Sequence, residues 1–194
     1  MVGFGYKQTW LSVRDGEPAA VRAALGLRDL GTVTWRAGID LAYLTDDRVV
    51  LTPPLSGWLL VTGLWLVRAA GRFPVAKLSA ELGTEVQRYL SHRVVEQHEW
   101  DRAVDGRLVR SFAYLGETGE LVRWIGDPDV AERDLGLPAQ PPDEDDGADL
   151  IVGESDVMRL AGRWSVDPTA LDGQPAPGPL RAAAPTWTTA VGFR

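Results

Sequence analysis

Apolar residues recur along this chain at two spacings, and together they predict strands that alternate with short helices. Residues 6–14 alternate between apolar and polar side chains, which is typical of a half-buried strand. Residues 18–25 and 75–82 instead carry apolar side chains at helical spacing. Each of these two segments is followed by a glycine, Gly26 or Gly83, and glycine is a common helix stop.

Further strands are expected where the apolar positions alternate or run together, over residues 32–44, 48–52, 58–67 and the long stretch 85–103. The strongest turn signal in the sequence is Asp105-Gly106, which is typical of a two-residue hairpin loop. A type I′ turn there pairs Val104 with Arg107. Counting back along the two strands then predicts an ion pair between Asp101 and Arg110.

The predicted elements follow the order strand, helix, strand, strand twice over residues 6–126. Trp10-Leu-Ser-Val opens the first copy and Trp58-Leu-Leu-Val the second. We therefore expect an α+β fold with a mostly antiparallel sheet, built from a duplicated unit. A duplication would place a groove at the pseudo-twofold axis, where the two copies meet.

Composition changes sharply near residue 138, which predicts three regions. Residues 1–137 form the expected core domain, and residues 138–154 are an acidic, proline-rich linker. Residues 155–194 comprise a helix that begins at Ser155 or Asp156 and ends near Trp164, followed by an extended Pro/Ala-rich tail. In this tail Trp187 and Phe193 are the candidate anchors. The helix could also dock on a second copy and form a homodimer.

The predicted element order resembles that of the gyrase-inhibitor-like family of small-molecule-binding domains. At a coarser level it is similar to the paired modules of the glyoxalase and extradiol dioxygenase superfamily. The resemblance covers residues 6–126 and concerns element order alone, because the sequence holds no motif of either family. No site residue is therefore carried over, and fold analogy is a weak guide to function.

Charge and cysteine content narrow the function classes. The net charge is −7, and the chain has no cluster of Lys and Arg, so nucleic acid is not expected as a partner. The longest apolar run, residues 58–67, is half the length of a membrane span, so no membrane partner is expected either. There is no cysteine, and 18 of the 20 basic residues are arginine, which favours a cytoplasmic protein from a bacterium.

Both histidines of the chain lie on the expected long strand over residues 85–103. On a continuous strand every second residue shares a face, so His92, Glu96 and His98 would point the same way. Imidazole and carboxylate groups suit zinc, iron or manganese, which makes these three residues the candidate metal ligands. The alternative is that they are polar groups at the end of a sheet, and no cofactor is otherwise expected.

The opposite face of that expected strand carries Tyr89, Arg93, Glu99 and Asp101, and arginines on neighbouring strands would add to it. Such a face could hold an anionic or peptide ligand. The acidic side chains between the arginines favour the alternative, in which the charged groups of this face pair with one another. Tryptophans fill cores and also line pockets and interfaces. The candidate residues for binding a ligand or partner are Trp58, Trp65, Tyr89, Arg93, Trp100, Arg110 and Trp124.

Three hypotheses on function follow. The first is a non-enzymatic protein that covers a protein partner of basic charge, as immunity proteins and antitoxins do, through an exposed aromatic and acidic patch. The second is a domain that binds or sequesters a small molecule in an aromatic-lined groove between the two repeats, which predicts a concave apolar pocket with one or two buried carboxylates. The third is a metal-dependent enzyme centred on His92, Glu96 and His98. The sequence favours the two binding hypotheses over the enzyme, because no spacing typical of a catalytic or metal site is present. Between these two, the acidic, tryptophan-rich composition favours the protein partner.

Overall fold

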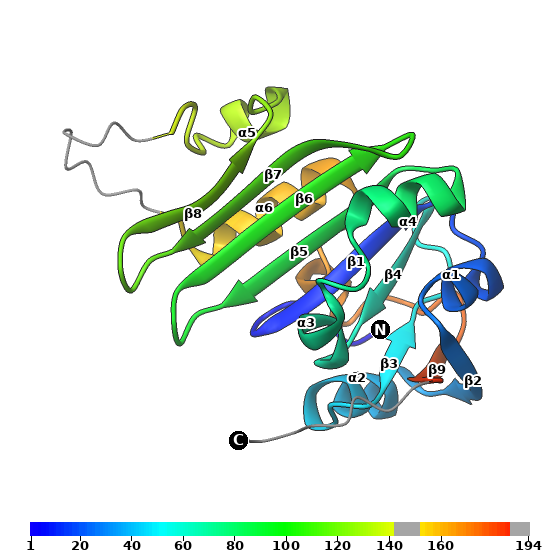
Figure 1. The fold of residues 1–194 in the computed structure, drawn as a ribbon. Coiled ribbons are helices and arrows are strands. Elements are labelled where there is room, and N and C mark those ends of the chain that lie inside the picture. The colour runs from blue at the N-terminus through cyan, green and yellow to red at the C-terminus, as the bar shows by residue number, and fades with distance from the viewer. Residues whose placement is uncertain (142–151, 187–194) are drawn as a thin grey trace, which may run out of the picture.

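The structure, a computed structural model, describes residues 1–141 and 152–186. Its strands form one antiparallel sheet in the order β2-β9-β3-β4-β1-β5-β6-β7-β8 (Figure 1). The strands are β1 (Gln8–Arg14), β2 (Leu27–Val33), β3 (Val49–Leu51), β4 (Trp58–Thr62), β5 (Val86–His92), β6 (Gln97–Val104), β7 (Arg107–Leu115), β8 (Glu120–Ile125) and β9 (Leu180–Pro185). The expected α+β class with a large antiparallel sheet is therefore confirmed.

Helices pack on both faces of this sheet. They are α1 (Pro18–Ala24), α2 (Trp35–Leu44), α3 (Trp65–Ala69), α4 (Val75–Leu82), α5 (Val130–Asp134) and α6 (Glu154–Trp164), with a 3-10 turn over Thr169–Leu171. The side chains of α1, α3 and α4 share one apolar core with one face of the sheet, here called the α4 face. Those of α2 and α6 share a second core with the other face, here called the α6 face.

The central strand β1 shows how the sequence fills two cores. Trp10 points into the core on the α6 face, and its neighbours Leu11 and Val13 lie in the core on the α4 face. All three side chains are buried, so a strand that alternates in sequence contributes to both layers. No helix in the described residues is long and apolar enough to span a membrane.

The prediction of a strand over residues 32–44 is wrong for most of its length. The chain leaves β2 at Val33, and Thr34 caps a helix by accepting a hydrogen bond from the backbone N–H of Ala37 at 3.3 Å. The buried residues Trp35, Ile39 and Ala42 stand at helical spacing. The alternation in this segment was therefore the weaker of two periodicities.

The segments 58–67 and 85–103 are each divided by a change of direction. β4 ends at Thr62, and Gly63, at φ 154°, leads into α3. The long stretch is a hairpin, because β5 ends at His92 and a turn with Glu96 at φ 48° leads into β6. Paired residues across this hairpin, such as Tyr89 and Trp100, have opposite parity. Odd-numbered residues of β5 and even-numbered residues of β6 therefore share a face, whereas one continuous strand would have placed them on opposite faces.

The Asp105-Gly106 turn is confirmed, but the register expected beyond it is not. Both residues have positive φ, 50° and 74°, as a type I′ turn requires, and Val104 pairs with Arg107. Opposite the step from Ala103 to Arg102 of β6, strand β7 contains one extra residue, since Ala103 pairs with Leu108 and Arg102 pairs with Arg110. This β-bulge shifts the pairing by one residue. Asp101 consequently faces Ser111 instead of Arg110, which turns to the other face.

The C-terminal region is not an appendage. β9 pairs with β2 on one side and β3 on the other, and Ala183 on it is fully buried. The apolar stripe of α6, which includes Leu160 and Trp164, packs on β5 and β6 of its own chain. That stripe is therefore covered without a second copy. Trp187 and Phe193 lie outside the described residues, and the internal duplication stays a prediction.

Candidate functional site

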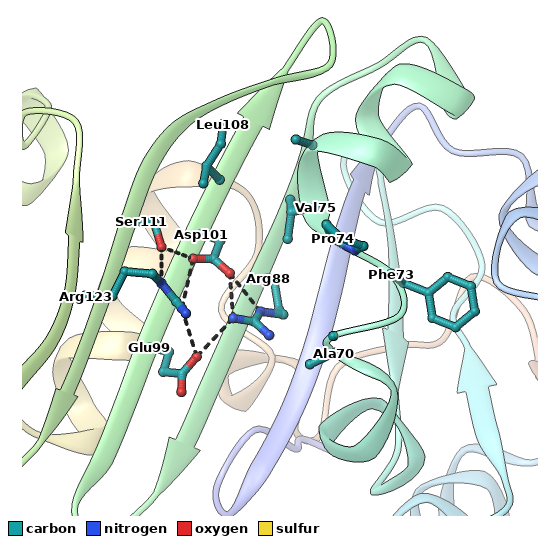
Figure 2. A pocket seen from close by; sticks show the side chains of 12 residues that line it. Ala70, Phe73, Pro74, Val75, Arg88, Glu99, Asp101, Leu108, Ser111 and Arg123 are labelled. Atoms are coloured by element: carbon teal, nitrogen blue, oxygen red, sulfur yellow. Dashed lines mark hydrogen bonds and ion pairs between the residues drawn. The ribbon is translucent and has the colours of Figure 1, made fainter. Parts of the chain in front are cut away.

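A cleft of about 450 Å³ opens on the α4 face, between the sheet and the connection from α3 to α4. Strands β5 to β8 supply a polar floor, and residues 70–76 supply an apolar wall (Figure 2). The lining residues are Ala70, Gly71, Phe73, Pro74, Val75, Ala76, Arg88, Glu99, Asp101, Leu108, Ser111 and Arg123. Five of them form the cluster described next, which we call the arginine pair cluster: Arg88, Glu99, Asp101, Ser111 and Arg123.

Arg88 on β5 is fixed by two carboxylates of the neighbouring strand. Its Nε donates to Oδ2 of Asp101 at 2.8 Å, and its Nη2 donates to Oε2 of Glu99 at 3.0 Å. Register accounts for this contact, because Arg88 is the direct cross-strand partner of Asp101. All three side chains are at most 13% exposed, so the ion pairs lie largely out of water.

Arg123 on β8 reaches the same carboxylates from the other side. Its Nη2 donates to Oε2 of Glu99 at 3.1 Å and to Oδ1 of Asp101 at 3.3 Å. Its Nε donates to the hydroxyl oxygen of Ser111, which in turn donates to Oδ1 of Asp101. Figure 2 shows the five side chains of the cluster converging on the floor of the cleft.

The hydrogen bonds of this cluster leave mainly donors unused. Both carboxyl groups accept on both of their oxygens, since Gln97 donates to Oε1 of Glu99 at 2.6 Å. Within residues 1–141 and 152–186, by contrast, no protein group accepts a hydrogen bond from Nη1 of Arg88 or Arg123. The cleft therefore presents N–H groups to whatever occupies it.

The wall of the cleft is aliphatic. Ala70, Pro74 and Val75 face the arginine pair cluster, whereas the ring of Phe73 points away from it (Figure 2). That ring packs instead against Trp65, with 5.7 Å between ring centroids. Leu108 on β7 lies at one end of the cleft and adds to its apolar surface. The cleft thus combines a polar floor with a small apolar surface, as many ligand sites do.

Comparison with known proteins does not identify a family for this chain. No protein-family model, no curated protein and no solved structure matches the chain. Function is therefore argued from the chemistry of the site itself, which is the stronger warrant even when a fold is familiar.

The structure does not bring the three candidate metal ligands onto one face. His92 lies an even number of residues from Val86 on β5, so both point to the α4 face. His98 pairs with Ser91, which points to the α6 face. The hairpin turn at residues 93–96 is the physical reason, because it reverses the chain between the two histidines. Among the described residues no group of three or more His, Asp or Glu could hold a metal ion.

Glu96 and His98 do line a common hollow of about 660 Å³, together with Arg93 and Glu154. Burial lowers the pKa of His98 below its ordinary value, although the charges of Glu154 and Glu96 act in the opposite direction. No described side chain donates to or accepts from Nδ1 of His98. Glu154 is held there by hydrogen bonds that its Oε1 accepts from the hydroxyl of Ser91, at 2.9 Å, and from the backbone N–H of Lys7, at 3.4 Å.

Most of the candidate ligand-binding aromatics are core residues. Tyr89 and Trp100 are fully buried; Tyr89 stacks on Trp10, and Trp100 stacks on Phe112 with 4.0 Å between ring centroids. Trp58 lies under the guanidinium of Arg14, and Trp65 is buried in α3. None of these side chains lines the cleft. Arg93 is exposed in the turn between β5 and β6.

Arg110 and Trp124 belong to a buried structural cluster on the α6 face. Nε of Arg110 donates to Oε1 of Glu132 at 2.8 Å, and the guanidinium lies 4.2 Å from the ring centroid of Trp124. Glu132 also accepts from the indole N–H of Trp100 at 2.9 Å and takes part in the capping box of α5 with Asp129. This cluster fastens α5 to the sheet and makes no contribution to the cleft.

A second polar network joins the sheet to α6 and gives a prediction for acid stability. Burial alone would raise the pKa of Glu85, but hydrogen bonds from Arg102 and Gln87 outweigh it, so the pKa lies below its ordinary value of 4.5. The native state therefore releases this proton more readily than the unfolded chain. The resulting stability is fully present above pH 4.5 and is lost as the pH falls through that value and the lower native pKa.

We accordingly expect Glu85→Gln to reduce the free energy of unfolding by about 1–2 kcal/mol at pH 7 and to flatten its decline between pH 5 and pH 3. Urea unfolding at several pH values measures both effects. Glu120→Gln, at an exposed position on the edge strand β8, is the matched control. A Glu85→Gln protein that loses stability in acid as steeply as the wild type would contradict the assignment.

None of the five residues of the arginine pair cluster was among the candidate binding residues of the sequence, although Glu99 and Asp101 were assigned to one face of the expected long strand. Arg88 was missed because a continuous strand over 85–103 puts it on the face opposite Asp101. Ser111 was missed because the expected register paired Asp101 with Arg110. No clear turn signal could have found Arg88, because the turn Arg93-Val-Val-Glu96 contains two valines and no Gly, Pro, Asn or Asp.

Proposed function

We propose that this chain is a small-molecule-binding domain whose ligand occupies the cleft between the arginine pair cluster and residues 70–76. The observation that supports it is the fixed pair of guanidinium groups with unused donors on the floor of a concave site. A volume of about 450 Å³ falls within the usual range for small-molecule sites. The buried carboxylates that the small-molecule hypothesis requires are Glu99 and Asp101.

Binding is favoured over catalysis by the state of the one hydroxyl in the cleft. The oxygen of Ser111 accepts from the cationic Nε of Arg123, which reduces its electron density and its strength as a nucleophile. Its proton is donated to Asp101, a carboxylate that already accepts from both arginines. Ser111 is therefore tied into the floor as a bridge between Asp101 and Arg123.

The protein-partner hypothesis has less support from the surface. It requires an exposed patch of aromatic and acidic side chains, but Tyr6 is the one aromatic among the large apolar residues that are exposed in the described ranges. The cleft also lies on β5 to β8 instead of at the central pair of β1 and β4, so a groove between two repeats is not needed for this proposal. A bacterial source and a cytoplasmic location stay predictions.

A fragment screen with a blocked variant tests the proposal. Ala76 lines the cleft from α4, and Ala76→Trp is expected to fill the space; Lys77→Trp, on the exposed side of the same helix, is the matched control. Saturation-transfer NMR should find fragments that bind the wild type and Lys77→Trp and are lost from Ala76→Trp. No bound fragment, or fragments that bind Ala76→Trp equally well, would refute a ligand site in the cleft.

A further inference from the structure

The two guanidinium groups of the cleft lie side by side and are held in place before any ligand arrives. Nη2 of Arg88 and Nη2 of Arg123 donate to the same oxygen, Oε2 of Glu99, at 3.0 and 3.1 Å. Asp101 also accepts from both arginines. Because these side chains are already ordered, a ligand that binds them loses little additional side-chain entropy.

The unused hydrogen-bonding capacity selects an oxygen acceptor. Each guanidinium is engaged through Nε and Nη2, which leaves the Nη1 amino group of each without an acceptor in the part of the chain that the structure describes. Guanidinium N–H groups match carboxylate and phosphate oxygens in geometry and charge. An amine or another cation would meet donors at the same positions and would be repelled.

The charges on the floor favour one negative charge over two. Arg88 and Arg123 are balanced by Glu99 and Asp101, so the arginine pair cluster is neutral as a whole. A ligand carboxylate that accepts from the Nη1 groups is attracted by both arginines and repelled by both acids. A phosphate dianion would double both the attraction to the arginines and the repulsion from the acids, whereas the cost of removing an ion from water rises with the square of its charge. A monoanion therefore suits this neutral floor better than a dianion.

The wall selects the body of the ligand. Ala70, Pro74 and Val75 face the cluster across the cleft, and Leu108 lies at its end (Figure 2). No aromatic ring is available there for stacking, because the ring of Phe73 points away. A short hydrocarbon group suits this surface, since burial of apolar area contributes roughly 25 cal/mol per Å² without a directional contact.

We infer that the cleft binds a short aliphatic monocarboxylate, whose carboxylate accepts hydrogen bonds from the Nη1 groups of Arg88 and Arg123. The hydrocarbon part lies against the connection between α3 and α4. This inference rests on the proposed function, because it names the ligand class of that same site. It adds a charge requirement that the fragment screen alone does not test.

Matched acid and amide pairs test the charge requirement. The probes are isovalerate with isovaleramide, cyclohexanecarboxylate with cyclohexanecarboxamide, and cyclohexyl phosphate as the dianion. Titration is followed in ¹H–¹⁵N spectra through the backbone amides of residues 70–76 and the Nε–H signals of Arg88 and Arg123. Each acid is expected to bind at least about tenfold more tightly than its amide, a difference of 1.4 kcal/mol. It should also bind more tightly than the phosphate.

Two variants assign the preference to the cluster. Arg123→Gln is expected to remove the tenfold preference for the acid while the amide binds as before, because one of the two Nη1 groups is lost. Arg107→Gln, an exposed arginine on β7 outside the cleft, is the control and should keep the preference. Thermal melts of both variants verify that each is folded.

Failure of this inference is distinguishable from failure of the proposed function. Amides that shift the same signals as tightly as the acids, or cyclohexyl phosphate as the tightest probe, would overturn the monocarboxylate and leave a ligand site in the cleft. Absence of binding by every probe would also overturn it, and the fragment screen with Ala76→Trp would then decide separately whether the cleft binds any small molecule.

Discussion

Replacing Glu132 with alanine is expected to destabilise the protein by about 3–5 kcal/mol, the largest effect of any single substitution considered. Glu132 is fully buried and is the ion-pair partner of Arg110, whose side chain is 3% exposed. Its removal leaves a guanidinium charge in the core and deprives the indole N–H of Trp100 and the backbone N–H of Asp129 of their acceptor. Urea unfolding at pH 7 measures the loss.

A second variant separates the unpaired charge from the lost contacts. In Arg110→Met combined with Glu132→Gln no charge is buried, and the Gln oxygen can still accept from Trp100 and Asp129. This double variant is expected to be more stable than Glu132→Ala, because most of the cost of breaking a buried pair is the charge that stays behind. A loss below about 1 kcal/mol for Glu132→Ala would show that Arg110 reaches water when unpaired.

Ala183→Asp is expected to cost at least about 3 kcal/mol, because it places a carboxyl group in an apolar core and directly opposite Asp29 of β2, whose like charge repels it. Ala183 is fully buried on β9, where it faces Val49 of β3 and belongs to the core on the α4 face. Were the C-terminal region an extended tail, the same substitution would have almost no effect. Thermal and urea unfolding therefore test whether β9 is an integral strand.

Arg181→Ala on the same strand is the matched control. Its side chain is 39% exposed and forms an ion pair with Asp29, so its removal is expected to cost no more than about 1 kcal/mol. Equal unfolding midpoints for Ala183→Asp and the wild type would mean that β9 leaves the sheet in solution. A large loss with Arg181→Ala as well would point to a general weakness of this edge of the sheet.

The shape of the cleft depends on one irregularity in the sheet. The bulge on β7 next to Leu108 turns Ser111 toward Asp101 and sends Arg110 to the opposite face. With the regular register, Arg110 would have joined the acids of the cleft and would not have reached Glu132. A single inserted residue therefore both assembles the arginine pair cluster and supplies the buried ion pair under α5.

Local signals predicted several elements correctly, each for an identifiable reason. Gly83 ends α4 at φ 64°, the left-handed conformation that favours glycine at a helix end. Asp105 and Gly106 form the expected turn, both with positive φ. In each case the residues within one turn of the backbone carry the information.

Segments with two competing periodicities were predicted less well. Residues 35–44 alternate and also repeat at helical spacing, and the helix forms because Trp35, Ile39 and Ala42 all reach the core on the α6 face. Burial in the tertiary structure decided between the two patterns. Residues 85–103 were also predicted wrongly, because the turn at Arg93-Val-Val-Glu96 carries two valines and continues the β-like pattern of its flanks.

The sequence by itself determined the α+β class, the antiparallel sheet, the helix ends at Gly26 and Gly83 and the hairpin at Asp105-Gly106, because these depend on local backbone preference and on burial pattern. Only the tertiary structure decided where β9 inserts and which polar side chains share a face. Strand order is set by contacts between residues far apart in the chain, and a one-residue shift in register moves every later side chain to the opposite face.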